Sequence, residues 1–393
     1  MKLSRRVESM QESATMAVAA RAAQLRRDGM DVIPFGAGEP DFPTPDHILA
    51  AAKKALDDGQ TKYSKPASGV PIVKEAVCAK LERENRLTYA PRQVIVTVGG
   101  KDACYMALQA LVEPGDEVIV PVPYWVSYPE MVALAGGVPV YLEGAAGNGF
   151  RITPDQIRRA LSERTRVLIL NYPSNPAGHM YTPQQVREIA ELLSGTKVAV
   201  MADEIYDRLV FGGREFLSFA AAGDDAYQRT ITINSASKTY AMPGWRIGFA
   251  AGPTDVIAAM AKLQSQSTSG AATFTQFAYA AALTGDQSWV DNMRAEFETR
   301  GRHMCRRLNE MPGVDCPDPE GAFYCFPSVA GAFGPLGVDS SQAFAEGLLN
   351  EAHVAVVPGG AFGMDHHVRL TFATSMERIE QGLERMARFV SRS

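Results

Sequence analysis

Long apolar runs and blocks of like charge are both missing from this 393-residue sequence. The longest uncharged stretch, residues 263–285, is rich in Gln, Ser, Thr and Gly, so it is too polar to span a bilayer. The N-terminal residues lead into a charged stretch without an apolar segment, and no signal peptide is expected. The net charge of −5 argues against a nucleic-acid or membrane-surface role. We therefore expect a cytoplasmic protein that binds neither nucleic acid nor membrane.

Cysteine and histidine are scarce and are not spaced as metal ligands. The five cysteines contain no C-x-x-C pair, and their odd number suits reduced thiols in the cytosol. The six histidines form no H-E-x-x-H motif, and the adjacent His366 and His367 would point apart on a strand. The sequence therefore predicts no metal site.

Internal repeats and low-complexity linkers are absent as well, whereas the 46% hydrophobic content is ample for a large core. From residue 93 onward, short apolar segments alternate with helical patterns, which indicates a mostly parallel sheet covered on both faces. The seven strands that we expect are residues 94–98, 117–121, 138–142, 166–170, 197–202, 230–234 and 246–250. Ligands of such sheets bind at the carboxyl ends of the strands.

The sequence pattern changes after about residue 285. A long charged helix is expected over 288–308, strands over 322–326, 354–357 and 368–372, and a closing helix over 376–390. These elements predict a second, smaller α+β unit. We therefore expect a large domain over 46–285, and a small domain made of 1–45 together with 286–393.

One stretch, Ser235 to Gly248, places two hydroxyls, Lys238 and Arg246 between two apolar strands. Burying a lysine and an arginine there is costly unless an anion neutralises them. A phosphorylated aldehyde would fit, because the lysine amine could form a Schiff base while the hydroxyls and Arg246 hold the phosphate. A single loop lysine is more often simply solvated, so other residues must decide between the two interpretations.

The predicted strand ends supply those other residues. Gly100 and Lys101 open a helix and could bind an anion, and an aromatic cluster around Trp125 could stack on a flat ring. Asp203 directly follows a buried strand and could pair with a protonated pyridine nitrogen, with Tyr206 three residues later. A plain turn or core packing would explain each feature alone. Together they match the groups that bind pyridoxal phosphate.

With these motifs the sequence resembles the class I aminotransferases of pyridoxal-phosphate fold type I, and among them the bacterial aspartate aminotransferases. The motifs that carry the resemblance span essentially the whole chain and are Gly36-Ala37-Gly38-Glu39-Pro40-Asp41, Lys62-Tyr63, Asn175-Pro176-x-Gly178, Asp203-Glu204-Ile205-Tyr206, Ser235-Ala236-Ser237-Lys238, Gly244-Trp245-Arg246-Ile247-Gly248 and Val368-Arg369-Leu370.

The resemblance implies a role for each cofactor-binding residue. Lys238 would hold pyridoxal phosphate as a Schiff base and then move the proton of the substrate in a ping-pong transamination. Asp203 would keep the pyridine nitrogen protonated, and Tyr206 and Asn175 would bond the phenolic oxygen of the ring. Trp125 would stack on the ring. The residues implied for the phosphate are Gly100, Lys101, Ser235, Ser237 and Arg246.

The resemblance also implies how substrate binds. Arg369 would take the α-carboxylate as a bidentate fork beside Gly38, Trp125 and Asn175. In the bacterial subgroup, a lysine and a threonine at the positions of Lys101 and Thr15 read the distal carboxylate, and Ser13 lies close by in the sequence. Aspartate and 2-oxoglutarate are therefore the expected amino and keto acids.

Tyr63 matches a family tyrosine that reaches the cofactor of the neighbouring subunit, which implies a homodimer with shared active sites. Two alternatives keep the cofactor: a prephenate or broader aromatic and dicarboxylic aminotransferase, and a C–S β-lyase. A pyridoxal-phosphate-sensing regulator would need an added DNA-binding domain, for which the match leaves no room. A nicotinamide-linked dehydrogenase would need a G-x-G-x-x-G motif after the first strand, and none is present there.

Overall fold

A seven-stranded sheet forms the centre of the computed structural model, which describes residues 1–8, 10 and 12–392. The strand order is β2-β8-β7-β6-β5-β3-β4; β8 runs antiparallel to both of its neighbours, and the other pairs are parallel. The mostly parallel sheet predicted from the sequence is thus confirmed. Its strands are β2 (Val94–Thr97), β3 (Glu117–Val122), β4 (Val138–Glu143), β5 (Thr165–Asn171), β6 (Ala199–Asp203), β7 (Thr230–Ser235) and β8 (Gly248–Ala251).

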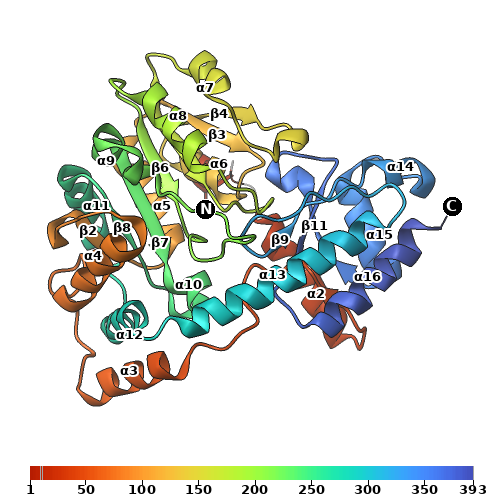
Figure 1. The fold of residues 1–393 in the computed structure, drawn as a ribbon, viewed down its shortest axis with the longest axis horizontal. Coiled ribbons are helices and arrows are strands. Elements are labelled where there is room, and N and C mark those ends of the chain that lie inside the picture. Colours follow the sequence, from red (N-terminus) through yellow and green to blue (C-terminus); the bar gives the residue numbers. More distant parts are fainter. Residues whose placement is uncertain (9, 11, 393) are drawn as a thin grey trace.

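Helices cover both faces of this sheet, as Figure 1 shows. Successive strand residues belong to different cores: Val167 and Ile169 pack with α5, α6 and α11, whereas Leu168 and Leu170 pack with α7 and α8. Because side chains alternate along a strand, two covered faces require a continuous apolar run, which is the pattern seen in the sequence. The helices of this unit are α3 (Asp46–Asp57), α4 (Pro71–Asn85), α5 (Gly100–Leu111), α6 (Ser127–Leu134), α7 (Pro154–Ala160), α8 (Pro183–Leu193), α9 (Asp224–Arg229), α10 (Ala236–Thr239), α11 (Thr254–Gln266) and α12 (Thr273–Thr284).

A second unit contains a three-stranded antiparallel sheet in the order β11-β12-β9, together with a parallel pair of β1 and β10. The strand predicted over residues 354–357 is wrong as a single element, because it divides between these two sheets: Val354–Ala355 pairs with Ile33–Pro34, and Val357–Pro358 pairs with β12. The strands are β1 (Ile33–Pro34), β9 (Tyr324–Cys325), β10 (Val354–Ala355), β11 (Val357–Pro358) and β12 (Val368–Thr371). The helices are α1 (Arg5–Glu8), α2 (Ala14–Arg27), α13 (Ser288–Asn309), α14 (Ala330–Leu336), α15 (Ser341–Ala352) and α16 (Met376–Val390).

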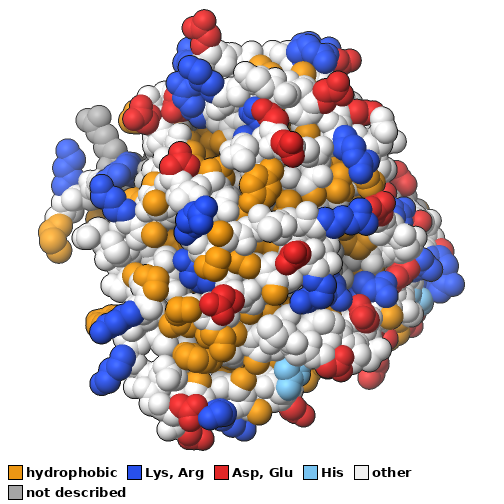
Figure 2. Space-filling model, turned by 60° about the vertical axis from the view of Figure 1, so that its left-hand side comes forward, with side chains coloured by type: hydrophobic (Ala, Val, Ile, Leu, Met, Phe, Trp, Pro, Cys, Tyr) orange, Lys and Arg blue, Asp and Glu red, His pale blue; other side chains and the backbone are white. Residues whose placement is uncertain are grey.

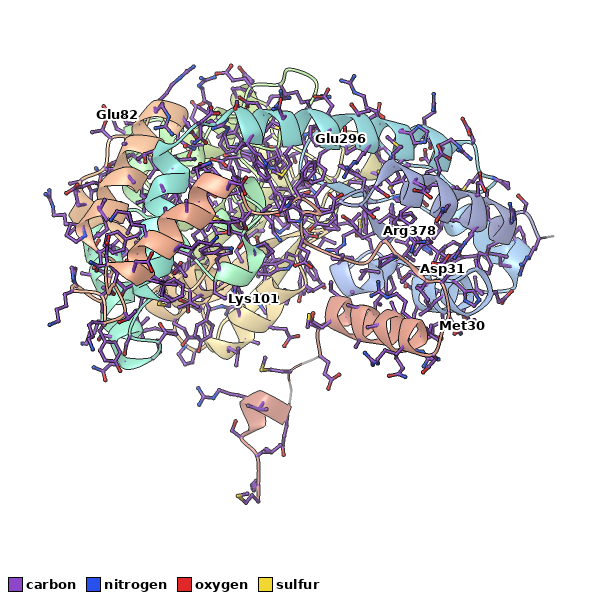
Figure 3. The ribbon with its side chains drawn as sticks, turned by 90° about the horizontal axis from the view of Figure 1, so that it is seen from below. Met30, Asp31, Glu82, Lys101, Glu296 and Arg378 are labelled. Carbon is purple, nitrogen blue, oxygen red and sulfur yellow. The ribbon has the colours of Figure 1, made fainter. Side chains whose placement is uncertain are left out.

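Helix α13 runs from beside α12 to the C-terminal helices (Figure 1). Its Arg300 is buried and places Nη1 2.9 Å from both carboxylate oxygens of Asp41, in the loop that follows β1. Near the end of α2, Asp31 accepts hydrogen bonds from Arg378 at 3.0 Å and from Arg385, both on α16 (Figure 3). The N-terminal residues thus pack on the C-terminal unit, and the domain boundaries themselves stay a prediction.

Within the described residues, no helix is both long and apolar enough to cross a membrane. The same residues include no group of three or more His, Cys, Asp or Glu side chains suited to a metal ion. All five cysteines are free thiols. The cytoplasmic location stays a prediction of the sequence.

Candidate functional site

A cavity of about 400 Å³ opens at the carboxyl ends of β5 and β6. It brings together residues that lie as far apart in the sequence as Gly38 and Arg369. The predicted site residues that line it are Ser13, Thr15, Gly38, Gly100, Lys101, Trp125, Asn175, Asp203, Tyr206, Lys238 and Arg369. Ser235, Ser237, Arg246 and Tyr63 do not line this cavity.

Lys238 lies on the short helix α10, directly after β7. The Ser235 hydroxyl caps this helix by accepting a hydrogen bond from the Ser237 amide at 3.2 Å. The Lys238 Nζ donates to the Gly38 carbonyl. Burial, together with the nearby Arg369 charge, lowers the pKa of Lys238 from its ordinary 10.5 to about 8. The amine therefore gives up its proton more readily than a solvated lysine.

Asp203 is the last residue of β6 and is buried. Its Oδ2 accepts hydrogen bonds from the Tyr128 hydroxyl at 2.7 Å and from the Cys104 thiol at 3.7 Å. Its Oδ1 accepts one from the Ile205 amide at 3.3 Å. Burial raises the pKa of Asp203, and these donors act in the opposite direction. Asp203 is thus a carboxylate at the cavity wall with neutral hydrogen-bond donors around it.

The turn after β6 presents two different faces. Tyr206 faces the cavity, and its hydroxyl lies 3.0 Å from that of Tyr324. Glu204 and Asp207 instead enter a buried polar network, in which Lys80 donates to Asp207 and the Ser218 hydroxyl donates to Glu204 at 2.8 Å. Because both faces of the turn are bonded, Tyr206 is held in place from behind.

Arg369 on β12 is 1% exposed and reaches the cavity from the second unit. Its guanidinium donates to Asn175 Oδ1 at 2.8 Å and to the Gly36 carbonyl at 3.0 Å. It also lies 4.5 Å above the Tyr324 ring. Its Nε is buried without a hydrogen-bond partner in the described residues. Arg369 therefore keeps both its full charge and donor capacity for a ligand.

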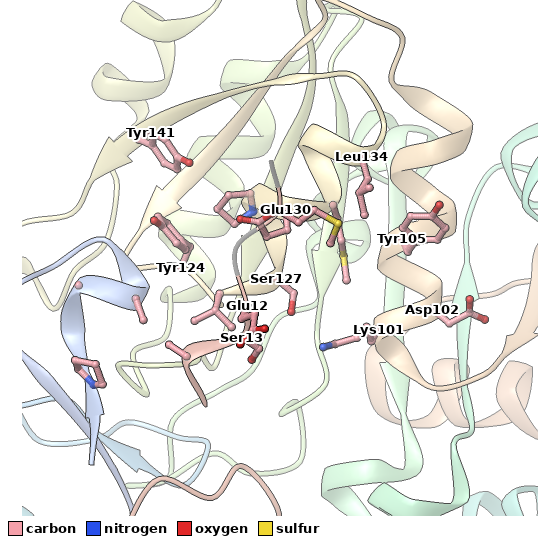
Figure 4. Close-up of a pocket in the computed structure, with 18 of the residues that line it drawn as sticks. Glu12, Ser13, Lys101, Asp102, Tyr105, Tyr124, Ser127, Glu130, Leu134 and Tyr141 are labelled. Carbon is pink, nitrogen blue, oxygen red and sulfur yellow. The ribbon is translucent and has the colours of Figure 1, made fainter. Parts of the chain in front are cut away.

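Lys101 extends from the first turn of α5 into this cavity and into a neighbouring one of about 1010 Å³. Figure 4 shows it reaching toward the N-terminal segment that carries Ser13. The Nζ lies 4.9 Å from the centre of the Trp125 ring, and this ring packs nearly perpendicular to that of Tyr128, with ring centres 5.2 Å apart. Burial, together with the Arg246 charge, lowers the pKa of Lys101.

The residues predicted to hold the phosphate lie around the start of α5. Gly99 has φ +84°, and a Cβ at this position would come within 2.6 Å of the Arg246 guanidinium. Arg246 donates to the Pro243 carbonyl at 2.8 Å and lines the 1010 Å³ cavity together with Lys101. Ser235 and Ser237 are buried beneath the cavity, and Ser235 is adjacent to Gly100. The amides of the first helical turn of α5 are further groups that could bind an anion.

Tyr63 points away from all of these groups. It is 82% exposed and lines a different cavity of about 830 Å³, together with residues 268–274. Within one protomer it does not reach the Lys238 cavity.

The sequence interpretation missed five contributors to the site: Gly36, Cys104, Tyr128, Asn171 and Tyr324. Asn171 donates to the Asp203 carbonyl at 2.8 Å and accepts from the Asn175 amide at 2.9 Å, so it fixes two predicted site residues at once. Its place at the end of β5 was a usable signal. Gly36 stands in one of the motifs that carry the resemblance, although no role was assigned to it. Tyr324 carried no signal, because only the packing of the second unit brings it here.

The cavity fits pyridoxal phosphate and an amino acid by its charge. No salt bridge in the part of the chain that the structure describes joins Lys101, Lys238, Arg246 or Arg369 to a carboxylate. Among the residues that the structure describes, the donors to the Asp203 carboxylate are all neutral groups. A phosphate and carboxylates would neutralise the excess positive charge, and a protonated pyridine nitrogen would pair with Asp203.

Several known proteins are similar to this chain in sequence and in fold. The model of the family described as aminotransferase class I and II matches residues 30–386. The chain is 47% identical to the aspartate aminotransferase of Geobacillus stearothermophilus over 99% of both chains, and 45% identical to the aspartate/prephenate aminotransferase of Cereibacter sphaeroides over 98% of both. The aspartate aminotransferase of Thermus thermophilus, solved with maleate, superimposes with a TM-score of 0.94 at 44% identity, over 99% of this chain and 100% of that one.

The contact between Gly99 and Arg246 can be tested with a matched pair of substitutions. Gly115 has a similar φ of +92°, but a Cβ there would meet no atom within 4 Å. We expect Gly99→Ala and Gly115→Ala to lower the free energy of unfolding by about 1 kcal/mol each, because both strain the backbone. Only Gly99→Ala should also weaken pyridoxal phosphate binding, about tenfold or more, in a fluorescence titration of the apoenzyme. Equal affinities would contradict this arrangement of the phosphate site.

The lowered pKa of Lys238 predicts how the stability of the apoenzyme depends on pH. Below about pH 8 the lysine is protonated although it is partly buried, which destabilises the fold; this cost is lost as the pH rises from 8 to 10.5. We expect Lys238→Met to stabilise the apoenzyme at pH 7 by about 1–3 kcal/mol and to give little gain at pH 10.5. Urea denaturation measures both values, with the exposed Lys53→Met as control. A gain that does not depend on pH would contradict the prediction.

Proposed function

The chain belongs to the class I and II aminotransferases, and we propose that it moves the amino group of L-aspartate to 2-oxoglutarate. It is a pyridoxal-phosphate enzyme, and the bound cofactor supplies the carbonyl that takes up the amino group and the ring that withdraws electrons from the substrate Cα. The single observation that carries the substrate assignment is that Arg369 and Lys101 line one cavity and neither has a carboxylate partner within the described residues. Two unneutralised cations suit a dicarboxylic substrate.

Lys238 acts as the proton carrier in this proposal. Its amine lies beside Gly38 and Arg369, and its lowered pKa lets it accept and release a proton near neutral pH. Asp203 holds the pyridine nitrogen protonated from the end of β6. Tyr206, which is held by Tyr324, and Asn175, which is held by Arg369 and Asn171, bond the phenolic oxygen. Trp125 covers one face of the ring.

The phosphate would lie at the start of α5. The Gly100 and Lys101 amides, the Ser235 and Ser237 hydroxyls and Arg246 are the groups assigned to it. Of these, Arg246 has a left-handed backbone, φ +51°, and lies two residues before β8. Anchoring the phosphate fixes the ring against Asp203 throughout the reaction.

Arg369 is assigned to the α-carboxylate and Lys101 to the distal carboxylate, with Ser13 and Thr15 beside it. Arg369 is prepared for this role, because Asn175, Gly36 and the Tyr324 ring fix its plane before substrate arrives. Maleate, which was bound in the Thermus thermophilus structure, is itself a dicarboxylate. This supports the assignment of two carboxylate subsites.

A prephenate or broader aromatic and dicarboxylic aminotransferase is the second candidate. Relatives that carry the name aspartate/prephenate aminotransferase support it. The adjoining 1010 Å³ cavity is lined by Tyr105, Met131 and Leu134, and it could take a larger side chain that extends past Lys101.

A donor panel with 2-oxoglutarate tests the role of Lys101. In Lys101→Ala, we expect kcat/KM for aspartate and glutamate to fall about 100-fold, because a buried carboxylate loses its counter-charge, and kcat/KM for phenylalanine and tyrosine to fall less than about fivefold. Lys54→Ala, which removes an exposed lysine on α3, is the control. An equal loss for every donor would assign Lys101 to cofactor binding instead.

The same preparation separates transamination from C–S β-elimination. An aminotransferase is converted to its pyridoxamine form by aspartate and is restored by 2-oxoglutarate, which the cofactor absorbance follows. Pyruvate release from cystathionine, together with no absorbance change on adding aspartate, would refute the proposal.

The proposal includes a homodimer that shares its active sites. Tyr63 is exposed and cannot reach its own cavity, and large apolar side chains near it in the sequence, Leu56 and Ile72, are 47% and 49% exposed. The side of the molecule that carries α3, α4 and α11 faces forward in Figure 2, where hydrophobic side chains gather across it. Helix α1 stands away from the body of the protomer (Figure 3). The apolar face formed by this side suits a second copy packed on it.

Mixing of variant subunits tests the shared site. Tyr63→Phe and Lys238→Ala homodimers should each be impaired: the first in cofactor affinity, the second in activity. In a mixed dimer, one site would combine Lys238 of the first variant with Tyr63 of the second, so we expect about half of its sites to regain wild-type affinity and activity. Sedimentation velocity checks that the protein is dimeric. No recovery on mixing would place Tyr63 outside the partner's site.

A further inference from the structure

We propose that Tyr128 is the positioning residue for Asp203: it holds this carboxylate ionised and oriented toward the pyridine nitrogen, and it sets the angle of Trp125 above the same ring. The inference rests on the proposed function, because it assumes that Asp203 and Trp125 contact pyridoxal phosphate. The sequence motifs gave Tyr128 no role.

The first step of the argument is the contact with Asp203. Tyr128 is 2% exposed on α6, and its hydroxyl donates to Asp203 Oδ2 at 2.7 Å. The Cys104 thiol approaches the same oxygen at 3.7 Å, and the Ile205 amide donates to Oδ1 at 3.3 Å. An ionised carboxylate only accepts, so this set of donors fits the ionised form. The phenol makes the shortest of these bonds, and bonds to a charged acceptor are the stronger kind.

The second step is the electrostatic balance around Asp203. Burial opposes its charge, whereas Tyr128, the Ile205 amide, Cys104 and the Lys238 charge favour it. Burial and the Asp203 charge raise the pKa of Tyr128 well above its ordinary value, so the phenol stays protonated and remains a donor. Tyr206 also lies near Asp203, and burial together with Tyr324 raises its pKa, so this phenol remains protonated as well. Tyr128 is thus the nearest group that offsets the burial of Asp203.

The third step is the contact with Trp125. The two rings meet edge to face, with centres 5.2 Å apart and planes at 86°, and the Tyr128 amide donates to the Trp125 carbonyl at 2.9 Å. The same side chain therefore touches the residue assigned to the pyridine nitrogen and the residue assigned to the ring face. Moving it would alter both contacts together.

Tyr128→Phe tests the proposal, because it removes one hydroxyl and keeps the ring that packs on Trp125. In the holoenzyme loaded with ¹⁵N-labelled pyridoxal phosphate, we expect the pyridine nitrogen resonance to move toward its unprotonated position. We also expect kcat to fall tenfold or more with a smaller change in KM, because a less protonated ring withdraws electrons less well. Cys104→Ala should shift the resonance in the same direction by a smaller amount.

Tyr172→Phe is the matched control. Tyr172 is likewise fully buried, and its hydroxyl donates to the Leu217 carbonyl at 2.9 Å, in the core formed with α7 and α8. We expect it to lower the melting temperature as much as Tyr128→Phe does, while the ¹⁵N resonance and kcat stay as in the wild type.

A Tyr128→Phe enzyme with a wild-type ¹⁵N resonance and kcat, whatever its melting temperature, would overturn the inference and leave Tyr128 a structural residue. If Tyr128→Phe does not fold, a wild-type resonance in Cys104→Ala would count against it in the same way. Failure of the proposed function is seen separately, because aspartate would then not convert the wild-type enzyme to its pyridoxamine form, whatever the ¹⁵N resonance of its cofactor.

Discussion

Uncompensated positive charge at the carboxyl edge of the sheet is the constraint on which the rest of this structure depends. Lys238 and Arg369 are withdrawn from bulk water beside a single cavity, and the described residues offer them carbonyl oxygens rather than carboxylates. Such a site is costly to the folded protein until anions arrive. In the proposed function this cost favours the binding of phosphate and carboxylate groups. Burial and the Arg369 charge also lower the pKa of Lys238.

The one buried carboxylate of the cavity, Asp203, is kept apart from these cations by its own set of donors. The turn that follows it is bonded on both faces: Tyr206 to Tyr324 in the cavity, and Asp207 to Lys80 behind it. Tyr206 and Asp207 are thus adjacent in the chain, yet one faces the cavity and the other a buried polar network. Asp203 likewise has its own donors, so this carboxylate and Lys238 could act on different ends of one ligand without neutralising each other.

Specificity depends on the contact between the two units. The second unit contributes Arg369 and Tyr324, and the loop after β1 contributes the Gly36 and Gly38 carbonyls that hold Arg369 and Lys238. That loop is in turn bonded to α13 through Asp41 and Arg300. In the proposed function, the residues assigned to the cofactor come from the large sheet, and Arg369, which is assigned to the α-carboxylate of the substrate, comes from the second unit. The relative position of the units would then decide how substrate meets cofactor.

The sequence by itself determined the seven strands and the cofactor class. A sheet covered on both faces requires unbroken apolar runs, and the polar residues assigned to the cofactor directly follow those runs in the sequence. Both patterns are local, so they can be recognised in the sequence. Only the tertiary structure decided which other residues hold these site residues in place. Tyr128 and Tyr324 look like core aromatics in the sequence, and residues 354–357 look like one strand, whereas in the fold they divide between two sheets. The reason is physical: hydrogen bonds between residues 75 or 118 positions apart leave no periodic trace along the chain.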